Sequence, residues 1–506
     1  MSSSFSVLDD MADCYRNAGS GESVGVAIAD VFKTPTIKPV LWPDPKLIEG
    51  ISDHQREELS KAITGNVGLF SGGPGCGKTH TIARLLKTIK RIHPNSTIKM
   101  MAPTGKAAQR MTEMAMLAGL PGVGGTTIHT GLVPQRNGHD GKGWGFFHGE
   151  GNPIYANVIV VDEATMISSD LMTHLLSAIG AGTLVLFVGD PNQLPPVGKG
   201  KPYVDMISAG LPHGHLTEIH RFSGRIAKVC QQIVAGERWN PSPSLDLEHP
   251  DFPENMRHVE CSEGNRISVL KDLLIRTKKR GFDLWDDVQV LCATNDLREK
   301  LNVELQEMLN PDGEKVDGCP FRIRDKIICT RNQWIEQDWG NGKKPVGNPQ
   351  HYIANGEIGI VRSIDKSHVV VEVDGGGKNK LLRFLKAAWK DISLAYAITT
   401  WKAQGSQYQV AIAIAEDSRG ADMICDASFW ITGISRGGKY SLTVGKRAAI
   451  DRQCARSGLV NRKTLLVEKI LKWLKPPENE NESAAEDSVI EGQKLQEAIT
   501  DDYSDV

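Results

Sequence analysis

The chain has 506 residues, enough for about three to five domains of ~100–200 residues each. Its composition, 40% hydrophobic and 24% charged, is ordinary for a soluble globular protein. No apolar run approaches the roughly 20 residues of a membrane span, and the first twenty residues lack the basic start and apolar core of a signal peptide. The nine cysteines form no C-x-x-C pair. We therefore expect no membrane segment and no structural zinc site, and a reducing, cytoplasmic setting.

The net charge of −2 hides an asymmetry between the body of the chain and its end. Residues 476–506 carry ten acidic residues and one lysine, so the rest of the chain has a net charge of +7. A mildly basic body permits a polyanionic partner. The acidic end contains few aromatic residues and is typical of a disordered tail. Three uses remain open for this tail: solubility, competition for a basic groove, and docking to a replication or recombination protein.

Taken in chain order, the first 50 residues predict an N-terminal arm or small domain without chemistry, because four prolines fall between residues 33 and 45. A helix capped by Ser52 or Asp53 follows. Nearly continuous apolar strands then alternate with helical segments: NVGLF, IKMMAPT, NVIVVDEAT and TLVLFVGD, and later DVQVLCATN, QVAIAIAE and SLTVG. Such strands are typical of a parallel sheet covered on both faces. The pattern predicts an α/β fold with two tandem domains and a cleft between them.

Two inserts interrupt the alternation. Residues 133–155 are rich in glycine and predict a hairpin. Residues 318–390 alternate strictly in FRIRDKIIC and HVVVEVDG, which predicts a small antiparallel β-domain. The expected boundaries are 1–50 for the arm, 51–220 for the first domain, 221–317 with 391–475 for the second, 318–390 for the β-insert and 476–506 for the tail.

The stretch LFSGGPGCGKTHT, residues 69–81, carries the clearest chemistry. An apolar strand, a loop G-x-x-x-x-G-K-T and a helix follow one another, as in a phosphate-binding P-loop. Glycines let backbone N–H groups close on phosphate oxygens, and the helix points its positive end at them. Lys78 would reach the β- and γ-phosphates and the Thr79 hydroxyl would hold Mg²⁺. The alternative is a plain glycine turn. The predicted nucleotide-binding residues are Gly72, Gly73, Pro74, Gly75, Cys76, Gly77, Lys78, Thr79 and His80.

Acidic and amide side chains follow two of the later strands. Asp162 and Glu163 end the strand VIVVDEAT, where Asp162 would bind Mg²⁺ and Glu163 would act as general base on the attacking water. Helix capping is the alternative for such a pair. Gln193, in GDPNQLPP, follows the next strand and could sense the γ-phosphate, although a proline-rich loop alone explains its position.

Eight motifs together resemble superfamily one helicases, most of all the RecD-like and Dda-like branch. In chain order they are GGPGCGKT, APTGKAAQRM, TTIHTGL, VVDEATM, GDPNQLPPVG, LTEIHRF, AYAITTWKAQGSQ and ITGISRGGK. The resemblance covers residues 50–450 and implies two RecA-like domains with ATP between them. It also implies an SH3-like module for the β-insert and a strand-separating pin for the hairpin.

The resemblance further implies roles for single residues in the cleft. Gln55 would read the adenine, and Arg221 and Arg436 would reach the γ-phosphate as arginine fingers. Lys402, Gln404 and Gly405 would couple the nucleotide to the DNA strand. The family has a histidine where this chain has Trp401, which leaves the tightness of that coupling open.

Residues at strand ends facing the cleft would form a track for single-stranded DNA. Hydroxyls, amides and backbone N–H groups bind phosphates without reading sequence, and aromatic rings add stacking faces. Each residue alone could equally be a cap or a turn, and the hairpin aromatics could be local packing. The predicted track consists of Pro103, Thr104, Lys106, Thr127, His129, Trp144, Phe146, Phe147, Thr294, Asn295, Thr400 and Lys402.

The sequence thus predicts an ATP- and Mg²⁺-dependent DNA helicase that moves 5′→3′ as a monomeric motor. No nuclease-type carboxylate cluster stands out. An RNA or RNA–DNA helicase remains an alternative within the enzyme class. An ATP-gated module that binds DNA or displaces protein without unwinding is an alternative of another class.

Overall fold

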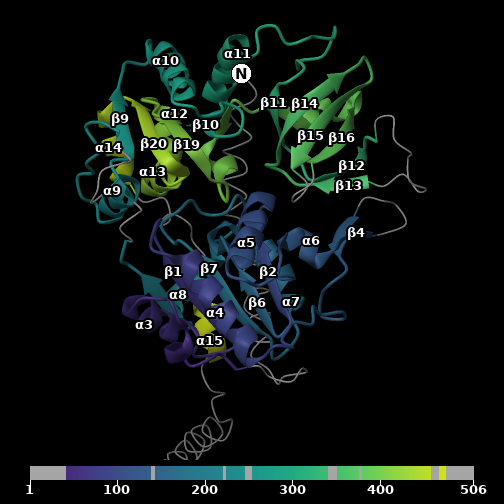
Figure 1. Cartoon of the computed structure of the whole chain (residues 1–506), viewed down its shortest axis with the longest axis vertical. Helices are drawn as coiled ribbons and strands as arrows, with labels where there is room; N and C mark the ends of the chain where they lie inside the picture. Colours follow the sequence, from purple (N-terminus) through teal and green to yellow (C-terminus); the bar gives the residue numbers. More distant parts are fainter. Residues whose placement is uncertain are drawn as a thin grey trace, which may run out of the picture.

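Two parallel β-sheets, one in each of two lobes, form the framework of the protein in the computed structural model (Figure 1). The structure describes residues 41–137, 143–219, 224–245, 253–339, 350–374, 379–456 and 466–474. In the part described, no helix is both long and apolar enough to cross a membrane.

The first lobe is built on a six-stranded parallel sheet with the order β3-β2-β6-β7-β1-β8. The central strands are buried on both faces, as their apolar sequences predict. The strands are β1 (Val67–Gly72), β2 (Ile98–Ala102), β3 (Gly125–Thr127), β6 (Val158–Val161), β7 (Leu184–Gly189) and β8 (His213–Leu216). The helices are α3 (Asp53–Ala62), α4 (Lys78–Ile92), α5 (Gly105–Leu117), α6 (Ile128–Leu132), α7 (Ser169–Ser177) and α8 (Pro202–Ser208).

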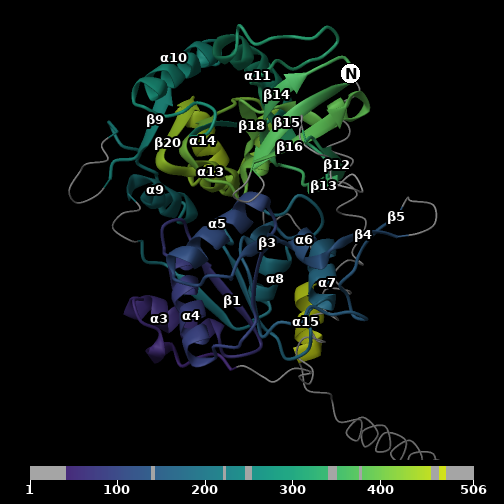
Figure 2. The same cartoon turned by 45° about the vertical axis from the view of Figure 1, so that its right-hand side comes forward.

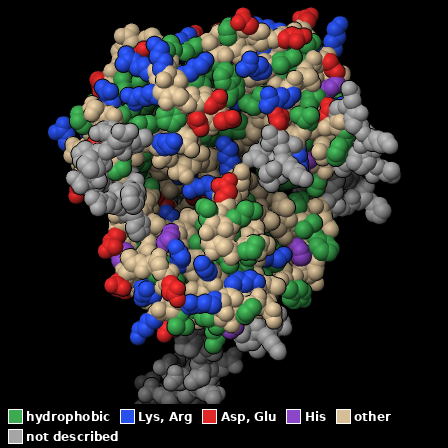
Figure 3. Space-filling model, viewed as in Figure 1, with side chains coloured by type: hydrophobic (Ala, Val, Ile, Leu, Met, Phe, Trp, Pro, Cys, Tyr) green, Lys and Arg blue, Asp and Glu red, His purple; other side chains and the backbone are tan. Residues whose placement is uncertain are grey.

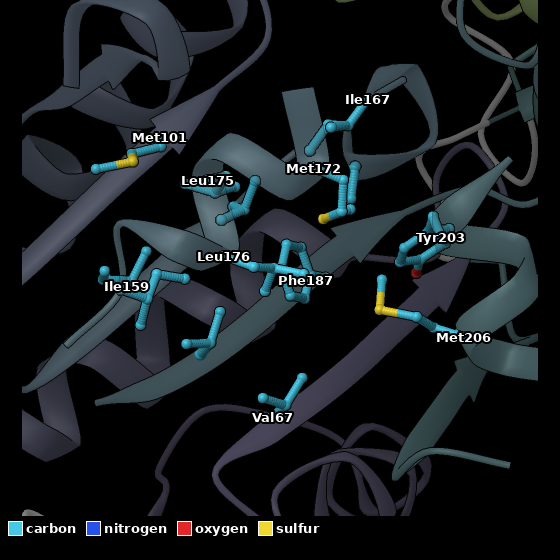
Figure 4. Close-up of a cluster of buried hydrophobic side chains, with 14 of the residues drawn as sticks. Val67, Met101, Ile159, Ile167, Met172, Leu175, Leu176, Phe187, Tyr203 and Met206 are labelled. Carbon is cyan, nitrogen blue, oxygen red and sulfur yellow. The ribbon is translucent and has the colours of Figure 1, made fainter. Parts of the chain in front are cut away.

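Each face of this sheet has its own hydrophobic core. One core joins Phe70, Leu86 and Val160 with the helices α4 and α5. The other lies beneath α7 and α8, where Phe187 and Tyr203 are buried together (Figure 4). Because both faces are covered by helices, the carboxyl ends of the strands are the open edge of the lobe, and ligands of such sheets bind there.

The second lobe repeats the design with a five-stranded parallel sheet of order β18-β10-β19-β20-β9. Its strands are β9 (Met256–Glu260), β10 (Val288–Cys292), β18 (Ala397–Thr399), β19 (Tyr408–Ile414) and β20 (Gly437–Gly445). Its helices are α9 (Gly224–Val234), α10 (Arg266–Lys279), α11 (Asn295–Leu309), α12 (Arg419–Ile424), α13 (Ala427–Ile434) and α14 (Arg447–Cys454). The α/β class with two tandem parallel-sheet domains is therefore confirmed.

A seven-stranded antiparallel sheet interrupts the second lobe. Val371 and Phe384 are fully buried in its own small core. Its last strand, Ile392–Leu394, pairs with the first, although we expected those residues to belong to the second α/β domain. The strands are β11 (Lys326–Cys329), β12 (Gln333–Gln337), β13 (Gln350–Ile353), β14 (Ile358–Ile364), β15 (His368–Asp374), β16 (Asn379–Leu385) and β17 (Ile392–Leu394). A separate hairpin of β4 (Pro134–Asn137) and β5 (Gly143–Phe146) extends from the first lobe.

The last described helix, α15 (Leu466–Leu474), returns to the first lobe (Figure 2). Leu466 and Ile470 are buried in the same core as Tyr203 and Met206 of α8. The expectation that residues up to 475 belong with the second domain is wrong for this helix. An amphipathic pattern shows that a helix has an apolar face, but it does not show which surface that face covers.

Candidate nucleotide site and nucleic-acid groove

The P-loop connects β1 to α4 at the open edge of the first sheet. Gly75 and Gly77 have φ angles of 78° and 81°, a left-handed conformation that glycine adopts without strain. Gly72 is packed so tightly that a Cβ there would lie 2.9 Å from Leu216. The Lys78 ammonium donates to the carbonyl oxygens of Gly72, at 2.5 Å, and Gly73, at 3.1 Å. The lysine is therefore held across the loop, over the place where phosphates bind.

The other predicted loop residues differ in exposure. Cys76 is buried, whereas Gly75, Thr79 and His80 are exposed and the remaining loop residues are half-buried or buried. The His80 ring lies 2.7 Å from the Gly50 carbonyl oxygen, so it faces the segment before α3 and not the loop.

Gln55 is buried in the first turn of α3. Its Oε1 accepts from the Ser52 N–H at 3.0 Å, while the Ser52 hydroxyl accepts from the Gln55 N–H. This capping box fixes the glutamine at the start of α3. Its role in reading adenine stays a prediction.

Asp162 and Glu163 lie directly after β6. Burial raises the pKa of Asp162 to about 6, and the negative Glu163 beside it adds to the shift. Glu163 has a φ of 53°, rare for a residue with a side chain, and its N–H donates to Asp162 Oδ1 at 2.8 Å. Within the described residues the Glu163 carboxylate has no hydrogen bond or ion pair. The Asp162 and Glu163 carboxylates and the Thr79 hydroxyl are oxygen donors of the kind that Mg²⁺ prefers, and Mg²⁺ takes its remaining ligands from phosphate and water.

A hydrogen bond joins the lobes beside this site. Arg436 of the second lobe is 4% exposed, and its Nη2 donates to Oε1 of Gln193 of the first lobe at 2.8 Å. Its Nε and Nη1 donate to the carbonyl oxygens of Thr432 and Ser406, both at 3.0 Å. Gln193 in turn donates to Asp190 at 3.2 Å. Burial lowers the pKa of the Arg436 guanidinium, while Glu163 opposes that shift. Residues 243 positions apart thus meet at the predicted γ-phosphate end.

The loop that carries Gln193 has two more bonds to the second lobe. The Leu194 N–H donates to the Thr432 hydroxyl, and the Gln404 amide donates to the Leu194 carbonyl oxygen, both at 2.8 Å. Gly405, with a φ of 69°, lies against Thr104, where a Cβ would approach the threonine Oγ1 to 2.4 Å. Arg221, the other predicted finger, lies outside the described residues.

Three of the predicted DNA-binding threonines are helix N-caps. Thr104, Thr127 and Thr294 each accept from a backbone N–H three residues later. The Thr294 hydroxyl also donates to Glu416 at 2.7 Å. Thr400 is fully buried, so the predicted contact between its hydroxyl and DNA is wrong for this structure. The sequence pattern placed it after a strand, but the side chain turns inward.

The remaining predicted track residues outside the hairpin differ in exposure. Pro103, Lys106 and Lys402 are half-buried and Asn295 is exposed. Burial lowers the pKa of Lys402, and the nearby Arg298 adds to the effect. Trp401, which replaces the family histidine, packs against Phe429 with ring centroids 5.4 Å apart. On the face shown in Figure 3, Lys and Arg side chains lie along parts of the border of the hollow between the lobes, together with acidic side chains.

A cavity of about 450 Å³ separates the hairpin from the antiparallel sheet. On the side of the first lobe, Phe146 lies 5.9 Å from His129 and 5.2 Å from His174 between ring centroids. Burial lowers the pKa of His129, and His174 adds to the shift. The two imidazole rings and the phenyl ring line the cavity and offer faces on which bases can stack.

The opposite wall of the cavity is mainly polar and carries one aromatic ring, that of Tyr352, and one cationic side chain, that of Arg331. Arg331 and Tyr352 come from the antiparallel sheet, and sequence reasoning missed both. Phe147 is half exposed beside the cavity, while the side chain of Trp144 lies outside the described residues. Residues missed at the sequence level are His174, Thr330, Arg331, Asn332, Tyr352 and Asn355.

Comparison with known proteins shows which helicases the chain resembles. An AAA domain profile matches residues 55–199. The chain is 28% identical over 451 residues to "RecBCD enzyme subunit RecD" of Mycolicibacterium smegmatis, a match that covers 82% of this chain and 76% of that protein. These matches show that the chain is similar to RecD-like helicases of superfamily one.

Two further matches bear on this RecD-like chain. It is 27% identical over 387 residues to the "ATP-dependent RecD2 DNA helicase" of Deinococcus radiodurans, covering 74% of this chain but only 47% of that protein. A crystal structure of Pif1 helicase from Bacteroides with ADP-AlF3 and ssDNA aligns at a TM-score of 0.44 and 16% identity, over 81% of this chain and 95% of the other. The RecD-like chain thus spans about half of the RecD2 protein it matches.

Proposed function

We propose that this RecD-like chain hydrolyses ATP between its lobes and thereby moves 5′→3′ along single-stranded DNA and separates duplex. One observation carries the proposal: the buried Arg436 of one lobe donates to Gln193 of the other beside the P-loop and the Asp162–Glu163 pair. A nucleotide bound at Lys78 would therefore contact both lobes at its γ-phosphate end.

The described residues fit an ordered set of roles. Lys78 would exchange its two carbonyl partners for β- and γ-phosphate oxygens. Thr79 and Asp162 would hold Mg²⁺, which lowers the charge on the phosphates when bound. Glu163 has a left-handed backbone conformation, and within the described residues its carboxylate has no hydrogen bond or ion pair, so it would take a proton from the attacking water. Arg436 would stabilise the charge that develops on the γ-phosphate, with Arg221 as a second finger.

Movement would follow from the bonds between the lobes. The loop that carries Gln193 and Leu194 is hydrogen-bonded to Thr432, Gln404 and Arg436 of the second lobe. Loss of the γ-phosphate removes the ligand that Gln193 and Arg436 share, so the contact between the lobes would weaken and the lobes would separate. The single strand would run over the lobe junction and through the cavity beside Phe146 and Tyr352, with stacking on the rings.

A strand-displacement assay on tailed duplexes tests the proposal. We expect ATP-dependent unwinding of DNA with a 5′ single-stranded tail, none with only a 3′ tail, and none by Lys78→Ala on either substrate. Unwinding of 3′-tailed DNA alone would overturn the polarity. Preferential unwinding of RNA duplexes would favour an RNA helicase, and DNA-stimulated hydrolysis without unwinding would favour an ATP-gated binding module.

A motor of this kind would serve DNA replication, recombination or repair in the cytoplasm as a monomer. The acidic tail, residues 476–506, lies outside the described residues. Its proposed use is contact with a protein partner or competition for the DNA groove, both resting on its charge of −9.

A further inference from the structure

Two lysines from different parts of the chain lie at one tyrosine ring. The Lys106 ammonium, from α5 of the first lobe, lies 4.6 Å from the ring centroid of Tyr408, and the Lys326 ammonium, from β11, lies 5.9 Å from it. Tyr408 begins β19 of the second lobe, so the cluster joins both lobes and the antiparallel sheet. Tyr408 is 4% and Lys326 3% exposed. Within the described residues the Tyr408 hydroxyl has no hydrogen-bond partner.

The backbone connects this ring directly to the nucleotide site. The Tyr408 N–H donates to the Arg436 carbonyl oxygen at 2.9 Å, and Arg436 Nη1 donates to the Ser406 carbonyl oxygen at 3.0 Å. Gly405, just before, contacts Thr104 of the first lobe. A shift of Tyr408 relative to Lys106 therefore also shifts Arg436 relative to Gln193.

The buried ammonium group of Lys326 has few interactions that compensate for its lost hydration. Its ammonium donates to the Val288 carbonyl oxygen at 3.2 Å, and among the described residues it has no ion pair. Burial lowers the pKa of Lys326 to about 7, and the positive Lys106 adds to the shift. Asp286 and Asp283, in the loop before β10, act in the opposite direction but do not bond to the lysine. When Lys326 is protonated, two positive charges meet at one ring and repel.

We propose that Tyr408, with Lys106 and Lys326 at its ring, is a positioning residue that makes closure of the lobes, and so ATP hydrolysis, depend on a backbone phosphate of the single strand. Without the strand, repulsion between the Lys106 and Lys326 ammonium groups keeps the lobes from reaching the closed geometry. In that geometry Arg436 contacts the γ-phosphate. A phosphate bound at the half-buried Lys106 neutralises its charge and removes the repulsion. The attraction between the ammonium groups and the Tyr408 ring then remains and favours closure of the lobes. The inference rests on the proposed function, because it assumes that the strand passes Lys106.

The sign of the pH dependence follows from the same charges. Below pH 7 Lys326 is protonated and the repulsion is complete, whereas above pH 7 it loses its proton and the repulsion ends. Hydrolysis without DNA should therefore rise by about threefold to tenfold between pH 6 and pH 8.5, as one pKa unit of coupling corresponds to tenfold. Saturating single-stranded DNA should flatten this rise, because the phosphate already removes the repulsion.

The test compares Lys326→Met with wild type in steady-state ATP hydrolysis, with and without oligo(dT), across pH 6 to 8.5. We expect the variant to hydrolyse ATP without DNA about threefold to tenfold faster than wild type at pH 6, without the rise through pH 7. Its DNA-saturated rate should match wild type within about twofold. Lys386→Met is the matched control, because Lys386 is exposed and its ammonium lies 5.8 Å from the ring centroid of Trp389, a lysine–ring contact that involves neither Tyr408 nor Lys106.

Two substitutions of Tyr408 distinguish a positioning role of its ring from simple packing. Tyr408→Phe keeps the ring face and removes the unpartnered hydroxyl, so its DNA stimulation should equal that of wild type. Tyr408→Leu keeps the apolar volume in part but loses the attraction to the ammonium groups, so DNA stimulation should fall while ATP KM without DNA stays the same.

An unchanged pH profile and an unchanged rate without DNA in Lys326→Met would overturn the inference, provided that wild type is stimulated by oligo(dT). Equal stimulation of Tyr408→Leu and Tyr408→Phe would overturn it as well. If wild type shows no stimulation by DNA at any pH, the proposed function itself fails, and the two failures are thereby distinguished. Circular dichroism melting curves establish that each variant is folded.

Discussion

The nucleotide cleft differs from the nucleic-acid groove, the surface formed by the predicted DNA track and the cavity beside Phe146, in how its side chains are engaged. In the cleft, Lys78, Gln193 and Arg436 have defined partners, and those of Arg436 include a residue of the other lobe. In the groove, the hydroxyls of Thr104 and Thr127 are already used as helix caps. The cleft is thus assembled to act on a specific ligand. The groove offers backbone amides, rings and a few cations, which suits a ligand of variable sequence.

We therefore expect substitutions in the cleft to cause large losses of ATP turnover and substitutions in the groove to cause smaller losses of DNA binding. Removing an arginine finger removes a contact that develops in the transition state. Removing one aromatic side chain from the groove removes only one of several stacking faces.

Arg436→Ala should lower DNA-stimulated ATP turnover by about 10³-fold, the scale of an arginine finger, with a smaller effect on ATP affinity. Arg436→Lys should recover little, because an ammonium cannot reproduce the planar fork that bonds Thr432, Ser406 and Gln193 together. Arg276→Ala is the control, since Arg276 is 72% exposed on α10. Turnover of Arg436→Ala within tenfold of wild type would contradict a cleft completed by the second lobe.

Glu163→Gln should bind ATP as tightly as wild type and lose at least about 10²-fold in turnover, as expected for removal of a general base. Equilibrium binding of a fluorescent ATP analogue and single-turnover hydrolysis measure the two properties separately. Tight binding with normal hydrolysis would show that another group takes the proton from water.

Tyr352→Ala should weaken binding of single-stranded DNA by about fivefold to 100-fold, since stacking contributes about 1–3 kcal/mol per base. Its DNA-saturated turnover should stay within about twofold of wild type, which distinguishes the groove from the cleft. Tyr155→Ala provides the control, because Tyr155 is 61% exposed and does not line the cavity. Equal affinity of Tyr352→Ala and wild type would remove the cavity from the DNA path.

Replacing Trp144, Phe146 and Phe147 together by Ala should reduce unwinding of a tailed duplex by about tenfold, yet leave ATPase stimulation by single strands largely intact. A ring at the hairpin is needed for separating strands and not for walking. If both activities fall together, the hairpin aromatics are structural, in agreement with the packing of Phe146 against His129 and His174.

Deleting residues 476–506 should tighten single-strand binding by a few-fold at low salt, because a charge of −9 is removed. The difference should vanish near 0.5 M salt, where the Debye length falls to a few ångströms. Superimposable titrations at low salt would assign the tail to solubility or to a protein partner.

A site was predictable from the sequence when its residues lie close together in the chain. The P-loop is one contiguous stretch between a strand and a helix, so Gly77, Lys78 and Thr79 could be assigned from spacing alone. The partner of Gln193 is 243 residues away, and only the resemblance to a helicase family suggested Arg436.

The groove was harder to predict because its residues are scattered and their roles are ambiguous. Threonine after a strand predicts either a phosphate contact or a helix cap, and the structure shows caps at Thr104, Thr127 and Thr294. His174 and Tyr352 belong to different elements that meet only after folding. Likewise, the sequence of α15 predicts an apolar face but not its site on the first lobe.

Distance measurement between the lobes tests the central claim, that one nucleotide site completed across both lobes drives the motor. Dyes introduced as unnatural amino acids at Leu117 of α5 and Val303 of α11, which are 91% and 59% exposed, would report closure by energy transfer. We predict that a non-hydrolysable ATP analogue with oligo(dT) shortens the distance in wild type and in Glu163→Gln, and has no effect in Lys78→Ala. The same distance with and without analogue in wild type would contradict the account.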